Sequence, residues 1–172
     1  KHLTSATKSN GIAITMPYWD ERVVEMAKNY PGINVDKFHI DILTAHFVQR
    51  PDFFDVVVAS NLFGDILSDQ IAGLVGGLGM APGANIGENA AIFEAVHGSA
   101  PDIAGKGVAN PISILLASAM MLDHVGKQDL AKRLRKAIID TLNIDAVRTR
   151  DLKGEATTKQ FTDAVCKRLS KQ

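Results

Sequence analysis

Three consecutive valines in the segment Asp55 to Ser60 (DVVVAS) limit the fold more tightly than any other stretch of the chain. Apolar β-branched residues without polar alternation are typical of a strand that is covered on both faces, as strands are in parallel sheets. A helix-like segment, NLFGDILSDQIAGLV, follows this run directly. We therefore expect a central strand at 55–60, with a helix after it, in an α/β fold.

Strand-like and helix-like segments alternate along the rest of the chain. Further strands are predicted at 3–6, 33–40 and 90–96. Apolar residues at helical spacing predict helices at 19–30, 41–50, 112–125, 128–142 and 158–169. Another helix is predicted to begin at 61 and to end where the glycines begin at 73. Glycine and proline predict loops in the stretches 73–87 and 97–111. The pattern predicts an α/β fold with a mainly parallel sheet and flanking helices.

Composition narrows the classes of partner and compartment. The chain has 172 residues, enough for one domain of ordinary size, and 19 basic residues balance 19 acidic ones. A net charge of zero gives no general attraction to nucleic acid or to an anionic membrane, and no apolar run approaches the roughly 20 residues of a membrane span. The single cysteine, Cys166, has no partner for an internal disulfide, which favours a reducing compartment such as the cytosol or an organelle matrix.

Three aspartates and one lysine are candidates for chemistry. Asp65 and Asp69 are four residues apart on a predicted helix, so both carboxylates project from one face and could hold a divalent cation. They follow the valine-rich strand, and ligands of open α/β sheets bind at the carboxyl ends of strands. The alternative is a solvated acidic pair. Asp41 is equally a candidate helix N-cap, and Lys8 an ordinary exposed lysine.

The segment EAVHGSAPDIAGKGVANP is a second candidate site. Its glycines at 98, 105 and 107 allow the backbone to approach a phosphate closely, and Asp102 offers a carboxylate of the kind that binds a ribose 2′-hydroxyl and repels a 2′-phosphate. The segment differs from the GxGxxG dinucleotide fingerprint. A purely structural loop is the alternative.

Four motifs together resemble the isocitrate/isopropylmalate dehydrogenase family of β-decarboxylating dehydrogenases. These motifs are TKSN, NLFGDILSD, GLVGGLGMAPGANIG and FEAVHGSAPDIAGKGVANP. The resemblance covers essentially the whole chain and implies an isopropylmalate dehydrogenase-like fold. It also implies that residues 1–172 are the carboxyl-terminal part of such a domain, without its amino-terminal half. The similarity is divided between tartrate/D-malate enzymes and NAD-linked isocitrate and homoisocitrate enzymes.

The resemblance assigns roles to individual residues. The metal-binding aspartates of the family, which hold Mg²⁺ or Mn²⁺, match Asp41, Asp65 and Asp69, and the catalytic residues match Lys8 and Asp41. Cofactor-binding positions match Asn10, Glu94, His97, Gly98, Ser99, Ala100, Asp102 and Asn110. Asp102 stands in the position that selects NAD over NADP, and Asn110 in the one that contacts adenine. Lys153 stands where relatives usually have glycine.

The reaction implied is NAD-dependent oxidative decarboxylation of a small-molecule 2-hydroxy acid, with isocitrate to 2-oxoglutarate favoured. Tartrate or D-malate, homoisocitrate and 3-isopropylmalate are the alternative substrates. We expect a homodimer or larger homo-oligomer in the cytoplasm or the mitochondrial matrix, in which Lys8 and Asp41 reach the site of a neighbouring subunit. The chain alone should be inactive, with exposed apolar surface and marginal stability or self-association. Two other classes stay open: a non-catalytic or regulatory NAD-binding subunit, and a structural interaction domain.

Overall fold

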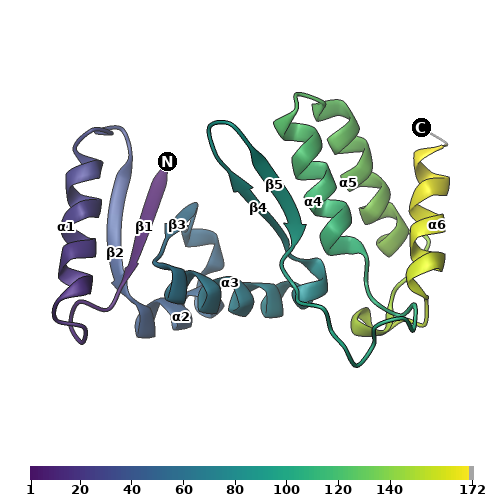
Figure 1. Ribbon diagram of the computed structural model, residues 1–172, viewed down its shortest axis with the longest axis horizontal. Helices are drawn as coiled ribbons and strands as arrows, with labels where there is room; N and C mark the ends of the chain where they lie inside the picture. The colour runs from purple at the N-terminus through teal and green to yellow at the C-terminus, as the bar shows by residue number, and fades with distance from the viewer. Residues whose placement is uncertain (171–172) are drawn as a thin grey trace. The chain divides into compact units, whose positions relative to one another are not determined.

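The chain folds into two compact units, Lys1–Leu74 and Val75–Gln172. The computed structural model describes residues 1–170. Each unit contains both strands and helices (Figure 1). Each unit has a core of its own and is described separately.

The first unit is built on a three-stranded parallel sheet with the strand order β2-β1-β3. Its strands are β1 (His2–Thr7), β2 (Asn34–His39) and β3 (Val56–Val58), and its helices are α1 (Thr15–Ala27), α2 (Ile40–Gln49) and α3 (Asn61–Val75), with a short 3-10 turn η1 (Pro51–Phe53). In the register, Thr7 of β1 pairs with His39 of β2. The two strands therefore end side by side, and the residues that follow them emerge at the same edge of the sheet.

The central strand β1 is rich in small polar residues, and neighbouring elements satisfy them. Thr4, Ser5 and Thr7 are buried. The Thr4 hydroxyl donates to Asp36 on β2 at 2.6 Å, and the Trp19 indole of α1 donates to Ser5 at 3.0 Å. Buried hydroxyls without partners would destabilise the sheet, so these bonds fix the position of α1 and β2 against β1.

The expectation of a central strand at 55–60 is wrong in this structure. Of these residues only Val56–Val58 form a strand, and within the described chain β3 pairs with β1 alone, at the edge of the sheet. Val56 is 58% exposed. The valine pattern measures how well a segment suits a covered sheet face, and it does not specify the order of the strands.

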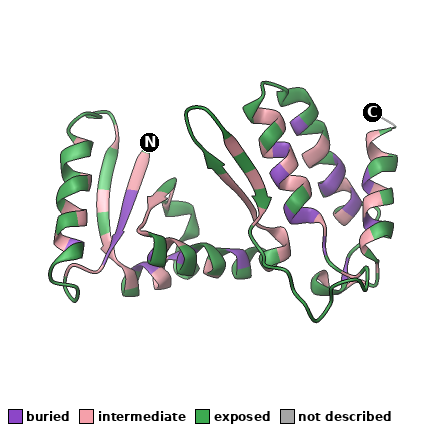
Figure 2. Ribbon diagram, in the orientation of Figure 1, coloured by how far each residue is buried: buried purple, intermediate pink, exposed green. Residues whose placement is uncertain are grey.

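Helices α2 and α3 close one side of the first unit. Ala6 of β1, Leu43 and Phe47 of α2, and Leu67 of α3 form one buried cluster, in purple in Figure 2. Each large side chain that is fully buried contributes about 1.5–3 kcal/mol. The Gln70 amide of α3 also donates to the Thr44 carbonyl of α2 at 2.9 Å. The shared cluster and this hydrogen bond connect the helices that follow β2 and β3.

The second unit joins a β-hairpin to three helices. It contains η2 (Leu78–Met80), β4 (Pro82–Ile86), β5 (Ala91–Ala95), α4 (Ile112–His124), α5 (Gln128–Asn143), η3 (Arg150–Leu152) and α6 (Thr158–Leu169). The sequence predicts these helices to within one residue at each end. Its core consists of Ile112, Ala137, Ile138, Phe161 and Val165 from α4, α5 and α6.

The glycine-rich stretch predicted as a loop contains a strand that the sequence pattern missed. Strand β4 pairs with β5 in antiparallel register, from Pro82 opposite Ala95 to Ile86 opposite Ala91. Pro82 is the first residue of the strand, a position where its missing N–H is tolerated. A β-carbon on Gly83 would lie 3.3 Å from Val96, so glycine allows the two strands to approach closely. The parallel sheet of the prediction is confirmed in the first unit, and the second sheet is antiparallel.

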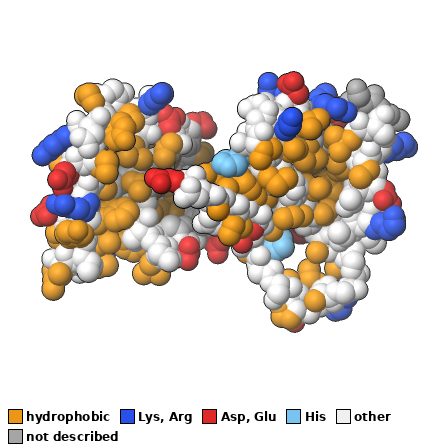
Figure 3. All heavy atoms as spheres, turned by 45° about the horizontal axis from the view of Figure 1, so that its top comes forward, with side chains coloured by type: hydrophobic (Ala, Val, Ile, Leu, Met, Phe, Trp, Pro, Cys, Tyr) orange, Lys and Arg blue, Asp and Glu red, His pale blue; other side chains and the backbone are white. Residues whose placement is uncertain are grey.

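Apolar side chains are exposed on both units, as the sequence predicts. On α3 of the first unit Leu62 and Ile66 are exposed, and on α4 of the second Ile114 and Met121 are. Figure 3 shows hydrophobic side chains over much of the visible face. Among residues 1–170, no helix is both long and apolar enough to cross a membrane.

Candidate active site

Lys8 and Asp41 meet at the carboxyl-terminal edge of the parallel sheet. Lys8 follows the last residue of β1, and Asp41 is the second residue of α2, which begins directly after β2. Because Thr7 and His39 are register partners, the two following segments lie side by side, and Lys8 Nζ is 3.0 Å from Asp41 Oδ1. The backbone N–H groups of Gly11 and Ile12 both donate to the Lys8 carbonyl, which holds the lysine in a tight turn.

Asp41 is ionised and accessible. The hydrogen bond from Lys8, together with the backbone N–H at the start of α2, lowers the pKa of the Asp41 carboxyl below its ordinary 3.8. The side chain is 64% exposed. The alternative interpretation of Asp41 as an N-cap is wrong, since His39 occupies that position. The carboxylate can therefore be reached from solvent while it is paired with Lys8.

Asp65 and Asp69 lie one turn apart on α3, as predicted. Both residues are exposed. Within residues 1–170 neither carboxylate accepts a hydrogen bond or forms an ion pair. Two unpaired carboxylates on one helix face fit a hard divalent cation. The described residues of a single copy contain no cluster of three or more His, Cys, Asp or Glu side chains that could hold a metal. The three predicted metal ligands are therefore not gathered within one copy.

The predicted cofactor loop of the second unit is an irregular segment after β5. The predicted positions Glu94, His97, Gly98, Ser99, Ala100 and Asp102 are all exposed. Asn85 donates to Glu94 at 3.1 Å, and a ring nitrogen of His97 lies 3.0 Å from the Gly98 carbonyl. Asp102 has no hydrogen bond or ion pair within the described residues. Its charge is therefore available to a ligand, and Asn10 of the first unit is likewise exposed.

The backbone of this loop turns sharply. The N–H groups of Ile103 and Ala104 both donate to the Ala100 carbonyl. Ala100, Gly105 and Gly107 have positive φ angles of 44°, 76° and 64°. Glycine takes this conformation without steric cost, which explains the two glycines at 105 and 107. The predicted loop is confirmed, and backbone groups that change direction in this way can surround an anion.

Asn110, at the end of the loop, differs from the other predicted cofactor residues because it is buried. Its Oδ1 accepts a hydrogen bond from the Ile112 N–H at 2.9 Å, and its Nδ2 donates to Asp151 Oδ2 at 2.8 Å. Thr158 secures the same segment, since its backbone N–H donates to the Gly107 carbonyl and its hydroxyl to that of Ala109. The sequence prediction missed Asp151 and Thr158, which are 41 or more residues away from the groups they contact.

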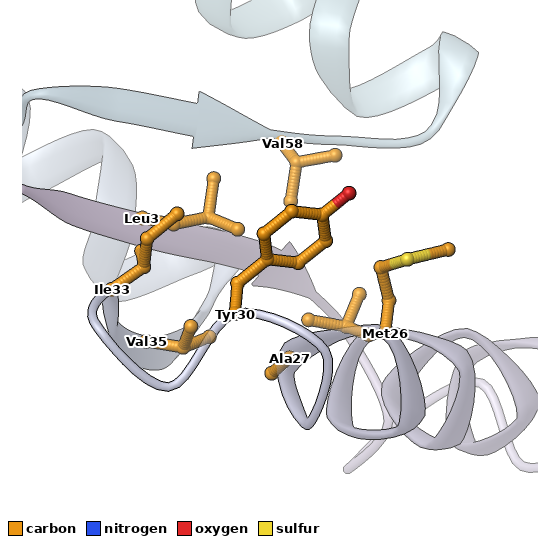
Figure 4. Close-up of a pocket in the computed structure, with 8 residues that line it drawn as sticks. Leu3, Met26, Ala27, Tyr30, Ile33, Val35 and Val58 are labelled. Carbon is orange, nitrogen blue, oxygen red and sulfur yellow. The ribbon is translucent and has the colours of Figure 1, made fainter.

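An apolar hollow of about 270 Å³ lies between α1 and the sheet of the first unit. Figure 4 shows Tyr30 and Met26 facing Leu3 and Val58 across it. Its lining contains no charged residue. A hydroxy acid carries carboxylates that need charged or polar partners, so this hollow is not the substrate site.

Comparison with known proteins decides the family. Residues 1–165 match the family model described as isocitrate/isopropylmalate dehydrogenase. The chain belongs to the isocitrate/isopropylmalate dehydrogenase family. It is 56% identical to the D-malate dehydrogenase [decarboxylating] of Escherichia coli, and the match covers 97% of this chain and 48% of that protein. It is 50% identical to the probable tartrate dehydrogenase/decarboxylase of Bacillus subtilis, over 99% of this chain and 49% of that protein.

A solved structure agrees with this assignment. The isocitrate dehydrogenase of Methylococcus capsulatus superposes with a TM-score of 0.94 at 46% identity, covering 98% of this chain and 50% of that one. The predicted isopropylmalate dehydrogenase-like α/β fold is thereby confirmed. The chain spans about half the length of the relatives that it matches.

Proposed function

We propose that this chain is the carboxyl-terminal part of an enzyme that oxidises and decarboxylates a 2-hydroxy acid with NAD⁺ and Mg²⁺ or Mn²⁺. The observation that carries the proposal is the placement of four groups in a family member. Lys8 and Asp41 are paired at the carboxyl edge of a parallel sheet, and the carboxylates of Asp65 and Asp69 on α3 have no partner among residues 1–170. Ligands of open α/β sheets bind at this edge.

The residues divide the work of the reaction. Asp65 and Asp69 would hold the cation, and Asp41 of a second copy would supply the third carboxylate, because the described residues of one copy do not gather all three. A cation held in this way would supply a Lewis acid, and NAD⁺ the oxidant. Lys8 Nζ lies beside the Asp41 carboxylate, so it is placed to orient the substrate hydroxyl and, after releasing its own proton to solvent, to take up the hydroxyl proton. A homodimer follows as part of the proposal.

The preference for NAD⁺ is proposed on the exposed Asp102. Its carboxylate has no cationic partner within the described residues, so its negative charge is not neutralised. A 2′-phosphate placed beside it would bring two like charges together, whereas a 2′-hydroxyl can donate a hydrogen bond to it. NAD⁺ meets this condition and NADP⁺ does not.

The substrate is the finer part of the proposal. The sequence favours isocitrate, while relatives named for D-malate, isocitrate/homoisocitrate and 3-isopropylmalate are 56%, 51% and 44% identical. Steady-state assays of the full-length protein with D-malate, tartrate, isocitrate and 3-isopropylmalate rank these substrates by kcat/KM. NADH formation with at least one of them, dependent on Mn²⁺, is the expected result.

Calorimetric titration of Mn²⁺ separates the enzyme from the two other classes. We expect the full-length protein to bind Mn²⁺ and the variants Asp65→Asn and Asp69→Asn to lose most of this affinity. Asp52→Asn is the matched control, since Asp52 is also an exposed acid of the first unit. A structural domain would give no heat with Mn²⁺ or NAD⁺, and a regulatory subunit would bind NAD⁺ without turnover of any substrate. Either outcome contradicts the proposal.

A further inference from the structure

Both polar atoms of the Asn110 side chain are engaged within the protein. Its carbonyl oxygen accepts from the Ile112 N–H, an Asx turn that starts α4. Its amide nitrogen donates to Asp151 and also lies 3.6 Å from the Met80 sulfur. The backbone N–H and C=O of Asn110 have no hydrogen bond within the described residues. The backbone N–H and C=O of Asn110 are therefore the groups that a nucleotide can engage without disturbing this network.

Asp151 is held from both sides. Its Oδ2 accepts from Asn110, and its Oδ1 accepts at 2.6 Å from the hydroxyl of Thr149, which is fully buried. Hydrogen bonds to an ionised carboxylate are about twice as strong as those between neutral groups. The buried threonine thus fixes the carboxylate, and the carboxylate fixes the asparagine.

Gly79 lies against the pair, although Asp151 itself is exposed. A β-carbon on Gly79 would lie 3.2 Å from both Asn110 Cβ and Asp151 Oδ2. The same carboxyl-terminal segment also holds the loop through the bonds from Thr158 to Gly107 and Ala109. The segment from Thr149 to Thr158 is therefore the support on which the end of the cofactor loop rests.

We propose that Asp151 is a positioning residue for the adenosine end of NAD⁺: its carboxylate holds the Asn110 carboxamide, so that the Asn110 backbone is presented to the nucleotide in one fixed position. This inference rests on the proposed function for the identity of the ligand. Asp151 acts through Asn110 and does not itself contact the cofactor. Removing it should weaken binding of the adenosine part and leave the chemical step unchanged.

The test measures dissociation constants of NAD⁺, AMP and nicotinamide mononucleotide for the full-length protein and its variants. In Asp151→Ala the constants for NAD⁺ and AMP should rise on the order of tenfold, the effect of one lost charged hydrogen bond. The constant for nicotinamide mononucleotide and kcat at saturating NAD⁺ should stay within about twofold. Asp151→Asn should restore most of the affinity, because its amide can accept from Asn110 and donate to the Thr149 hydroxyl.

A double-mutant cycle tests whether Asp151 works through Asn110. If it does, adding Asp151→Ala to Asn110→Ala should weaken NAD⁺ binding by less than about twofold further. Fully additive losses would overturn the proposal, since they would mean that Asp151 contacts the ligand directly. Unchanged NAD⁺ affinity in Asp151→Ala would also overturn it.

Two further measurements separate this proposal from general instability and from failure of the proposed function. Val165→Ala is the matched control, because it opens the core of the second unit and Val165 makes none of the hydrogen bonds of this network; it should lower stability and leave NAD⁺ affinity unchanged. Exchange of the Ile112 amide hydrogen, followed without cofactor, should accelerate in Asp151→Ala but less in Asp151→Asn and Val165→Ala. If wild type binds no NAD⁺, the proposed function fails. The exchange rates still test whether Asp151 holds the Asn110 side chain in place. Equal exchange in all variants would overturn that support.

Discussion

Replacing Lys153 by glycine should stabilise the protein. Lys153 ends the short turn η3 in the left-handed conformation, with φ of 60° and ψ of 29°. Its N–H donates to the Arg150 carbonyl, and the next N–H, of Gly154, donates to Thr149. The turn therefore fixes Lys153 in a conformation that favours glycine, the residue that relatives are expected to carry there.

The magnitude follows from two opposing contributions. A residue with a β-carbon loses about 1–2 kcal/mol in the left-handed region. Glycine offsets part of this gain because it gives the unfolded chain about 0.5–1 kcal/mol more conformational freedom. The expected net gain is about 0.5–1 kcal/mol in the free energy of unfolding. For a chain of this size that raises the melting temperature by about 1–4 °C.

The assay is urea unfolding of wild type, Lys153→Gly and Lys153→Ala, followed by circular dichroism. Lys153→Ala is the control, since it removes the exposed side chain and keeps the β-carbon that causes the cost. Its stability should lie within about 0.5 kcal/mol of wild type. If glycine destabilises the protein, or if alanine stabilises it as much as glycine does, the argument from backbone conformation is refuted.

Three further predictions concern the core and the two candidate sites. Phe161→Ala should lower the free energy of unfolding by about 3–5 kcal/mol in chemical denaturation, because Phe161 is fully buried among α4, α5 and α6; a loss under 1 kcal/mol would show that this core is loosely packed. Lys8→Met should lower kcat by about a hundred to ten thousandfold while the melting temperature hardly changes, since its ion pair with Asp41 is exposed; parallel losses of activity and stability would speak for a structural role. Asp102→Ser should reduce the preference for NAD⁺ over NADP⁺ by at least about tenfold in kcat/KM, whereas an unchanged preference would exclude the role given to Asp102.

Helices and the first two strands could be predicted from the sequence because their signals are local. Apolar spacing and capping residues define α6, for example, where Thr157 and Gln160 form a capping box directly before and inside the helix. Strand β4 could not be predicted in this way. Pro82 and Gly83 disfavour a strand locally, and the segment is a strand because it pairs with β5.

In the candidate site, too, local signals could be predicted from the sequence and long-range contacts could not. Placing Lys8 and Asp41 after two strands of one parallel sheet is enough to expect them at the same edge, and the ion pair shows that they are neighbours. Nothing near Asn110 in the sequence indicates that its side chain is committed to Asp151. A contact over such a separation depends on how α4, η3 and the loop pack together. Sequence patterns therefore predicted the loop after β5 but not the residues that support it.

The central claim is that Asp65 and Asp69 of one copy and Asp41 of another hold one divalent cation. Anomalous diffraction from crystals of the full-length protein grown with Mn²⁺ measures this directly. The account predicts one manganese peak per site, coordinated by these three carboxylates from two subunits. A peak bound by other residues, or by Asp65 and Asp69 with no Asp41 from any neighbouring subunit within coordination distance, would contradict it.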